Sequence, residues 1–268
     1  LAESAGFCFG VRRAVQEAER CAQEGLSVCT LGPIIHNKFV TQRLEGMGVR
    51  QAQTLMDARA HTVIIRSHGV PPETEAALKK QCVKLADVTC PFVKKIQNIA
   101  ARAYEEGKQV VIIGEKEHPE VIGINGYCHN SAVVINSSEE AAETDFSGRE
   151  LCLVAQTTAN KKKWQEIVEF LRKSGYNMQV HNTICSATGQ RQAEAAELAA
   201  RCDVMIVVGC RESSNTRKLY EICRQLCKRT YAVESAQELS ALEIDSPLSI
   251  GITAGASTPD WVIKEVVN

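Results

Sequence analysis

Three of the twelve cysteines differ from the others in their surroundings: Cys8 lies in AGFCFGV, Cys90 in DVTCPFV and Cys185 in NTICSAT. They are 82 and 95 residues apart, close to one third of the 268-residue chain. A thiolate is a metal ligand, and three of them brought together can bind zinc with a fourth ligand or hold an iron–sulfur cluster. The alternative is that all three are buried as small apolar residues, which is common for cysteine.

The three cysteines mark an internal repeat. Each is followed by a helical pattern of apolar residues and then by a β-branched run, SVCTLG, VVIIGE or VMIVVGC. A glycine lies 24 residues after each cysteine, and a polar residue lies 28 residues after it. The glycines are Gly32, Gly114 and Gly209, and the polar residues are His36, His118 and Ser213. Such a register favours three equivalent units over three unrelated buried cysteines.

Alternation of strands and helices predicts an α/β fold with small, mostly parallel sheets and right-handed crossovers. We expect three similar α/β units, residues 1–90, 91–185 and 186–268. They are expected to pack tightly as a trefoil with pseudo-threefold symmetry. Ligands bind at the carboxyl ends of parallel strands, so the loops after the strands are expected to converge there.

Those loops are rich in hydrogen-bond donors. His36, His68 and His118 each follow a predicted strand, and neutral donors and protonated imidazoles suit a phosphate or diphosphate. Comparable places are taken by Thr157 and Thr158 in the second unit and by Ser213, Asn215 and Ser257 in the third. The sequence has no G-x-x-x-x-G-K-[ST], so a P-loop does not supply the anion site. A three-cysteine [4Fe–4S] cluster leaves one iron open, which can act as a Lewis acid and hold a substrate oxygen.

Glu120 is the candidate proton donor, because it lies two residues after His118 in EHPEV. A carboxyl group beside a closed, anionic site can have a raised pKa and give up a proton. The alternative is a glutamate favoured by the dipole in the first turn of a helix that starts at Pro119. Both interpretations are compatible.

Composition excludes several classes of protein. Charged residues are 24% of the chain and the net charge is -1, which does not fit a nucleic-acid-binding surface. The apolar runs are too short for a membrane helix, which needs about 20 residues. No signal peptide is visible. We therefore expect a cytoplasmic protein with free thiols and no nucleic-acid or membrane partner.

The motifs together resemble a known family. AGFCFGVRRA, GPIIHN, RSHGVP, DVTCP, EHPEVIGI, QTT, TIC-x-AT-x-x-RQ, SSNTRKL and TAGASTPDWVI are similar to the 4-hydroxy-3-methylbut-2-enyl diphosphate reductases, over essentially the whole chain. The resemblance implies an oxidoreductase of isoprenoid biosynthesis by the methylerythritol phosphate (non-mevalonate) pathway. Such an enzyme removes the hydroxyl of (E)-4-hydroxy-3-methylbut-2-enyl diphosphate with two electrons and two protons. The products are isopentenyl diphosphate, dimethylallyl diphosphate and water.

The resemblance also implies the cofactor, the site residues and a partner. The cofactor is a [4Fe–4S] cluster with three cysteine ligands and one open iron, which binds the substrate hydroxyl. The ligands are Cys8, Cys90 and Cys185, and the residues that act on the hydroxyl are Glu120, Thr157 and His118. The residues that hold the substrate are His36, His68, His118, Thr157, Ser213, Ser214, Asn215 and Ser257. A ferredoxin or a flavodoxin donates the electrons.

Two other functions use similar residues. An iron–sulfur hydro-lyase also has three cysteines and an open iron, but its reaction needs no reductant. An iron–sulfur electron carrier or sensor needs neither the donor loops nor Glu120.

Overall fold

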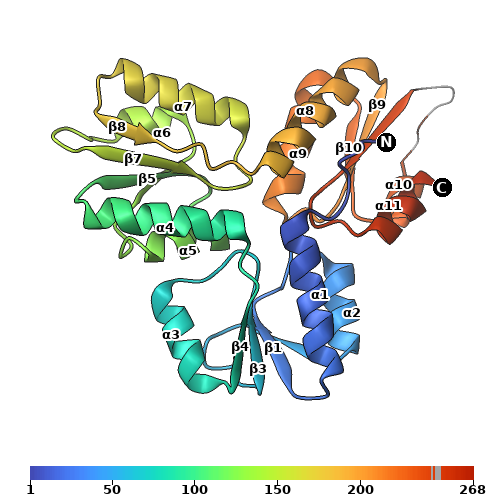
Figure 1. The fold of residues 1–268 in the computed structure, drawn as a ribbon. Coiled ribbons are helices and arrows are strands. Elements are labelled where there is room, and N and C mark those ends of the chain that lie inside the picture. The colour runs from blue at the N-terminus through green and yellow to red at the C-terminus, as the bar shows by residue number, and fades with distance from the viewer. Residues whose placement is uncertain (243, 245–248) are drawn as a thin grey trace.

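The computed structural model describes residues 1–242, 244 and 249–268 of the chain. In this part there are three small β-sheets, and every strand pair in them is parallel. Figure 1 shows the three sheet units around a common centre, the first at the bottom, the second at the upper left and the third at the upper right. The predicted α/β fold is confirmed.

The first and second sheets each have four strands. The first has the order β2-β1-β3-β4 and consists of β1 (Val28–Leu31), β2 (Val49–Ala52), β3 (Thr62–Ile65) and β4 (Lys84–Asp87), with helices α1 (Phe9–Gln23), α2 (Lys38–Gly46) and α3 (Pro72–Gln81). The second has the order β6-β5-β7-β8 and consists of β5 (Gln109–Ile113), β6 (Val133–Ile135), β7 (Leu151–Ala155) and β8 (Met178–Val180), with helices α4 (Pro91–Glu105), α5 (Pro119–Gly126), α6 (Ser138–Glu143) and α7 (Lys161–Lys173).

The third sheet has the order β10-β9-β11 in the described residues. It consists of β9 (Val204–Val208), β10 (Thr230–Val233) and β11 (Ile250–Ala254), with helices α8 (Ser186–Arg201), α9 (Ser214–Leu226), α10 (Ala236–Ser240) and α11 (Asp260–Val267). The N-terminal segment lies beside its β11, because the Ala2 amide donates to the Ile252 carbonyl at 2.8 Å (Figure 1). This segment takes the place that the fourth strand has in the other two sheets, so the chain closes into a ring.

The glycine repeat has a structural cause. Gly32, Gly114 and Gly209 each come directly after the first strand of a sheet. Their amides donate to the carbonyls of the last residues of the second strands, at 2.8, 3.0 and 2.9 Å. Gly32 and Gly209 have positive φ, which a residue with a Cβ rarely adopts. The same turn therefore opens the first loop of all three units.

Burial explains why the central strands are continuously apolar. Four of the five residues of β5 and all five of β7 and β9 are buried, as expected for parallel strands covered on both faces. Each sheet has one hydrophobic cluster on either side. No helix in the described ranges is long and apolar enough to cross a membrane. One sheet falls in each of the predicted ranges, while the boundaries themselves stay a prediction.

Candidate active site

The three marked cysteines occupy equivalent positions at the starts of three long helices. Cys8, Cys90 and Cys185 are the N-cap residues of α1, α4 and α8, which have 15, 15 and 16 residues. Each cysteine amide donates to the carbonyl of the second residue after the third strand of a sheet. The acceptors are Ala256, Ser67 and Thr157, at 3.2, 2.9 and 3.1 Å. The backbone therefore repeats the same cysteine turn three times around the centre.

The electrostatics of these turns favour an anionic sulfur group. A helix N-terminus carries a partial positive charge, and here three of them meet at one place. None of the three helices has an acidic residue in its first turn. Burial raises the pKa of the Cys90 thiol, and the nearby Cys8 and Cys185 raise it further. Three thiolates that line one cavity repel one another, and a bound metal centre would compensate their charge.

The backbone at the start of α1 lies very close to the Cys90 thiol. A Cβ on Gly10 would lie 2.8 Å from the Cys90 Sγ, so only glycine fits between the start of α1 and this thiol. Zinc–sulfur bonds of about 2.3 Å place the sulfurs of a single zinc site about 4 Å apart. Among the described residues, the three histidines form a group whose ligand atoms all lie within 4.8 Å of one another, whereas the three thiols do not.

Sequence reasoning missed Arg191, which connects two of the cysteine turns. Its side chain is buried, and its guanidinium donates to the Gly6 carbonyl at 2.7 Å and to the Ala187 carbonyl at 3.2 Å. These acceptors lie two residues before Cys8 and two residues after Cys185. Burial lowers the pKa of Arg191, and the two cysteines oppose that effect. The available signal was that Arg191 is the single cation in the first two turns of α8.

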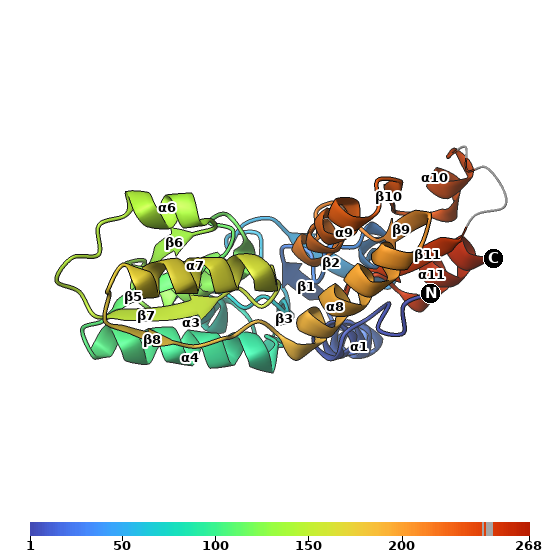
Figure 2. The ribbon, with the colours of Figure 1, turned by 90° about the horizontal axis from the view of Figure 1, so that it is seen from above.

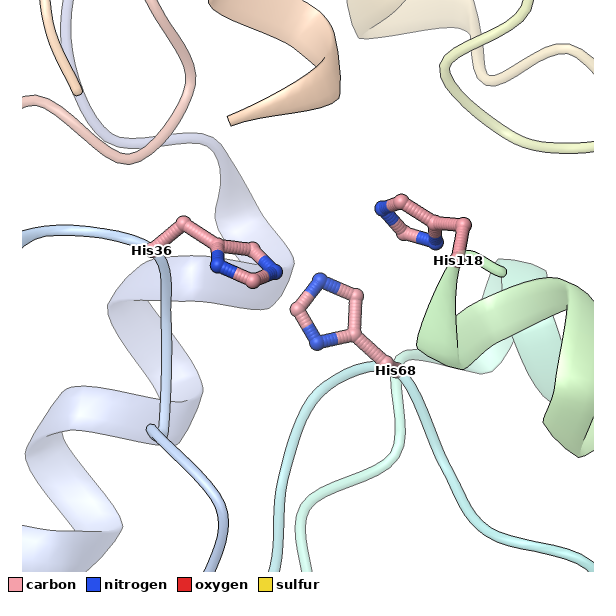
Figure 3. A group of neighbouring side chains, drawn as sticks. All are labelled: His36, His68 and His118. Carbon is pink, nitrogen blue, oxygen red and sulfur yellow. The ribbon is translucent and has the colours of Figure 1, made fainter. Parts of the chain in front are cut away.

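The three predicted histidines meet on the other side of the cavity. Their ring centroids are 5.1 Å apart for His36 and His68, 5.3 Å for His68 and His118, and 6.1 Å for His36 and His118. Figure 3 shows the three rings pointing toward a shared space from separate segments. Their ligand nitrogens all lie within 4.8 Å of one another, so the group could also hold a metal ion.

The imidazoles are uncharged in this arrangement. Burial is the main cause that lowers the pKa of each histidine, and it brings that of His118 to about 4. Nδ1 of His118 accepts from the Glu120 amide at 3.1 Å, which leaves Nε2 to carry the ring proton. Both nitrogens of His36 and Nδ1 of His68 are buried without a hydrogen-bond partner in the part of the chain described. Such unpaired polar atoms need a ligand to satisfy them.

Glu120 is buried in the first turn of α5, and Thr157 binds both of its carboxyl oxygens. The Thr157 amide donates to Oε1 and the Thr157 hydroxyl donates to Oε2, each at 2.6 Å. Burial raises the pKa of Glu120 to about 7, and the two hydrogen bonds oppose the rise. The carboxyl group is therefore close to half protonated at neutral pH, which suits a proton donor.

The third sheet contributes the start of α9 and the loop after β11. Both polar atoms of the Asn215 amide are buried without a partner among the residues that the structure describes. The Ser257 hydroxyl donates to the His36 carbonyl at 3.1 Å. Ser213 caps α9, and its Oγ accepts from the Thr216 amide at 3.4 Å. Asn215 is thus the donor group of this loop that most clearly lacks a partner.

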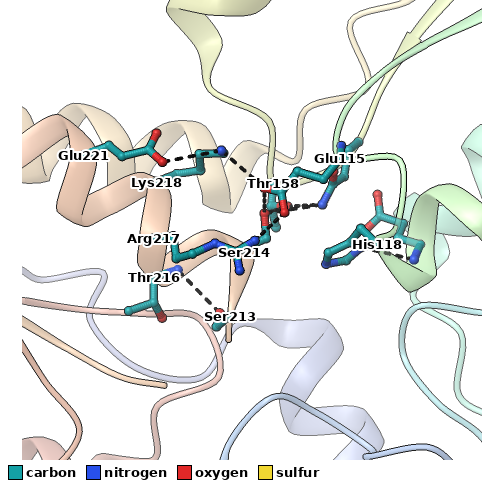
Figure 4. A network of polar contacts seen from close by, with 11 residues as sticks. Glu115, His118, Thr158, Ser213, Ser214, Thr216, Arg217, Lys218 and Glu221 are labelled. Atoms are coloured by element: carbon teal, nitrogen blue, oxygen red, sulfur yellow. Dashed lines mark hydrogen bonds and ion pairs between the residues drawn. The ribbon is translucent and has the colours of Figure 1, made fainter. Parts of the chain in front are cut away.

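Ser214 is engaged in a network that sequence reasoning did not predict (Figure 4). Its hydroxyl donates to Glu115 at 2.9 Å and accepts from Thr158 at 3.2 Å. Glu115 also forms ion pairs with Arg217 and, at 3.2 Å, with Lys218. Burial raises the pKa of Glu115, but the Ser214 hydrogen bond and the two cations outweigh it, so the pKa is lowered. The network joins the loop after β5 to the start of α9, between the second and third sheets.

These groups line one cavity of about 110 Å³. All of the predicted site residues line it: Cys8, His36, His68, Cys90, His118, Glu120, Thr157, Cys185, Ser213, Ser214, Asn215 and Ser257. Ser67, Thr188 and Arg191 also line it and were not predicted. Ser67 and Thr188 each lie within three residues of a predicted one, and this was the signal available. The remaining cysteines are free, and those at 21, 29, 128, 152, 223 and 227 are buried.

Known proteins resemble this chain over its full length. The 4-hydroxy-3-methylbut-2-enyl diphosphate reductase of Caldanaerobacter subterraneus subsp. tengcongensis is 46% identical over 274 residues, which covers 100% of this chain and 94% of that protein. The reductase of the same name from Aquifex aeolicus is 44% identical over 270 residues and covers 99% and 93%.

Two solved structures are similar as well. A structure of (E)-4-hydroxy-3-methyl-but-2-enyl diphosphate reductase, the terminal enzyme of the non-mevalonate pathway, matches with a TM-score of 0.72 and 43% identity, and covers 99% of this chain and 96% of that one. The E-1-hydroxy-2-methyl-but-2-enyl-4-diphosphate reductase of Plasmodium falciparum matches with a TM-score of 0.90 and 28% identity, and covers 98% and 85%. The LytB protein family matches residues 1–268, so the chain belongs to this family.

Proposed function

We propose that the chain reduces (E)-4-hydroxy-3-methylbut-2-enyl diphosphate to isopentenyl diphosphate and dimethylallyl diphosphate. One molecule of substrate, two electrons and two protons give one molecule of product and one of water. The observation that carries the proposal is one cavity lined by three N-cap thiols, by a group of unpaired donors and by a buried carboxyl group of raised pKa. The names of the relatives support the same reaction.

Cys8, Cys90 and Cys185 are proposed to ligate a [4Fe–4S] cluster. The three helix N-termini that begin at these cysteines, and the close approach that Gly10 permits, fit a bound anionic group. When bound, the cluster supplies electrons and an open, Lewis-acidic iron for the substrate hydroxyl. Arg191 adds a fixed positive charge beside two of the ligands, which opposes the negative charge of the thiolates.

His36, His68, His118, Ser213, Ser214, Asn215 and Ser257 are proposed to hold the diphosphate. Buried polar atoms without partners are costly, and a diphosphate would accept hydrogen bonds from the donor nitrogens of His36, His68 and Asn215 at once. Ser214 has to exchange its hydrogen bond to Glu115 for one to the substrate. Loops from all three sheets contribute donors, so bound substrate is shielded from bulk water.

Glu120 is proposed to give its proton to the leaving hydroxyl, with Thr157 and His118 beside it. A hydroxyl group is a poor leaving group, and a proton converts it into water. Thr157 holds the carboxyl group in place through two short hydrogen bonds, in which its amide and its hydroxyl donate. To relay the proton, the hydroxyl gives its own proton to the leaving group and accepts the proton of Glu120. The Nε2 proton of His118 remains available to orient the substrate oxygen.

We further propose a cytoplasmic location and a ferredoxin or a flavodoxin as electron donor. All twelve cysteines are free in the structure, and a reducing compartment keeps them so. The reaction consumes two electrons in every turnover, so a separate carrier must deliver them. The carrier is oxidised by one electron in each of two encounters per substrate molecule.

The proposal is tested by an anaerobic assay of the synthetic diphosphate alcohol with dithionite-reduced methyl viologen. Iron and acid-labile sulfide are measured on the same sample. The expected result is reductant-dependent formation of the two diphosphate products by a protein that contains close to four irons and four sulfides. Turnover without reductant would indicate a hydro-lyase, and a loaded protein that leaves the alcohol unchanged would overturn the assignment.

A further inference from the structure

A second sequence pattern follows two of the three proposed cluster ligands, and the proposed reaction does not use it. The fourth and fifth residues after the cysteine are both basic in the first two units, Arg12 and Arg13 after Cys8 and Lys94 and Lys95 after Cys90. In the third unit the same positions are the neutral Gly189 and Gln190. The cations are therefore confined to the starts of α1 and α4. We call the group Phe9, Arg12, Arg13, Phe92, Lys94 and Lys95 the cationic face.

Two phenylalanines in this face are exposed. Phe9 is the first residue of α1 and is 66% exposed, and Phe92 is the second residue of α4 and is 42% exposed. Phe92 also lines the central cavity, so its ring lies between the proposed cluster site and the solvent. On a helix, residues three and four apart share a face, so Arg12 and Lys95 lie beside these rings. An exposed aromatic centre with a charged rim is typical of a protein-binding surface.

The cations are unfavourably placed for the helices themselves. The N-terminal end of a helix is the positive end of its dipole, and it favours Asp and Glu over Lys and Arg. In the described part of the chain, neither Arg12 nor Lys95 has an ion-pair or hydrogen-bond partner. No internal contact therefore explains their position, whereas an anionic partner at this face would.

The starts of the two helices meet at the proposed cluster ligands. A Cβ on Gly10 would touch the Cys90 Sγ, and the Arg13 guanidinium donates to the Thr89 carbonyl at 2.8 Å. Figure 2 shows α1 and α4 along the same side of the molecule. A shallow groove on this side is lined by Arg13, Asp87, Thr89, Pro91, Lys94, Lys95, Asn98, Ile99 and Arg102. Asp87 is its one acidic residue, and it is neutralised by the ion pair with Lys94.

We infer that the cationic face docks a small acidic electron-carrier protein, in an orientation that places the redox centre of the carrier next to Cys8 and Cys90. This inference rests on the proposed reductase function and names where its electron donor binds. Two reduced carriers are each oxidised by one electron, and the substrate takes up both electrons with two protons. Charges around such a contact act mainly on the association rate and on its salt dependence.

The test compares two reductants on the loaded enzyme. An acidic bacterial ferredoxin is the protein probe, and methyl viologen is the small reductant that needs no docking surface. The variant is the double substitution Arg12→Glu/Lys95→Glu, and the matched control is Lys228→Glu, an exposed lysine just beyond the distant end of α9. We expect kcat/KM for reduced ferredoxin to fall about 10-fold or more at low salt in the double variant, because two attractive charges become repulsive. With methyl viologen the rate should stay within about 2-fold of wild type, since neither residue lines the cavity.

If the double variant loads its cluster poorly, a second measurement on the wild-type enzyme still tests the docking site. In the wild-type enzyme, raising the salt concentration from about 0.05 M to 0.5 M should slow the ferredoxin-dependent rate and leave the viologen rate unchanged. The docking site is overturned if the double variant loses no more ferredoxin activity than Lys228→Glu. A ferredoxin rate that does not respond to salt overturns it equally. Failure of the wild-type enzyme with methyl viologen would instead refute the proposed reductase function.

Discussion

Thr157 binds both carboxyl oxygens of Glu120, with its amide on Oε1 and its hydroxyl on Oε2, each at 2.6 Å. Thr157 lies in the loop after β7 and Glu120 in the first turn of α5, which follows β5, and β5 and β7 are neighbouring strands of the second sheet. The same threonine also accepts the Cys185 amide at its carbonyl, at 3.1 Å. One residue therefore connects the proposed proton donor to a proposed cluster ligand, and it fixes the carboxyl group relative to the place where the substrate hydroxyl must lie.

Replacing Glu120 with Gln should abolish most turnover while the substrate still binds. Gln keeps the size and can accept one of the two Thr157 hydrogen bonds at its carbonyl, but it cannot act as the acid. General acids contribute about 10²- to 10⁴-fold, so a fall of that order in kcat is expected in the viologen assay. Calorimetric binding of the substrate to the oxidised enzyme should change little. Full activity of Glu120→Gln would remove this carboxyl group from the mechanism.

The pH dependence of kcat provides a separate test of the same group. The donor must be protonated, and burial raises the pKa of Glu120 to about 7, so kcat should fall as the pH rises through about 7. Thr157→Val removes the hydroxyl that stabilises the carboxylate, so the pKa should rise and the falling limb should move to higher pH. Thr158→Val is the matched control, because Thr158 contacts Ser214 rather than Glu120. If the falling limb of the pH profile of kcat stays at the same pH in Thr157→Val, the titration belongs to another group.

Much of this site could be predicted because it lies on a repeat. The offsets of 24 and 28 residues reflect one helix–strand–loop unit built three times, and they place His36, His118 and Ser213 in the loops after equivalent strands. The closure of the ring could not be predicted, because the N-terminal segment bonds through Ala2 to β11 at the far end of the chain. Such a contact depends on how the third sheet is completed, which no local pattern encodes.

The site residues that the sequence did not predict were missed for the same physical reason. Glu115 has no repeat partner, and Lys218 and Arg191 are charged residues within helices. The side chains of Glu115 and Lys218 are nevertheless only 22% and 8% exposed, and Arg191 is buried. Each contacts a neighbouring sheet unit, and the hydrophobic periodicity of a helix reports only the burial against its own sheet.

Serine substitutions should separate the proposed cluster ligands from the other cysteines. Cys8→Ser, Cys90→Ser and Cys185→Ser should each lower the iron and sulfide content of anaerobically reconstituted protein severalfold, because serine is a poor ligand for a cluster. Cys82→Ser should retain the full content, since Cys82 caps the distant end of α3 and does not line the cavity. The measurement is iron and sulfide per protein together with the visible absorption of the cluster. Equal losses in all four variants would undo the assignment of ligands.

Binding of a diphosphate should be accompanied by proton uptake. Burial lowers the pKa of His36, His68 and His118, so the three imidazoles are neutral at pH 7 in the free protein. An anion among them favours the protonated form and raises these pKa values. Titration calorimetry with inorganic pyrophosphate at pH 7, in buffers of different ionisation enthalpy, should show net uptake that diminishes in His68→Asn. Binding with no proton exchange would place the diphosphate elsewhere.

Glu115 should contribute to stability through Lys218, whose ammonium group is buried between the second and third sheets. Glu115→Gln leaves this ammonium with Glu221 alone, at 3.7 Å, so we expect a loss of about 2 kcal/mol, or a melting temperature lower by roughly 5 °C. Glu221→Gln, which keeps the Glu115 contact, should cost far less. The pKa of Glu115 is lowered in the folded protein, so its contribution is complete above its unfolded pKa of about 4.5 and is lost as the pH falls through the lower folded pKa. The difference in melting temperature between wild type and Glu115→Gln should therefore shrink at low pH, and a difference that is constant from pH 7 to pH 3 would exclude the carboxylate as its source.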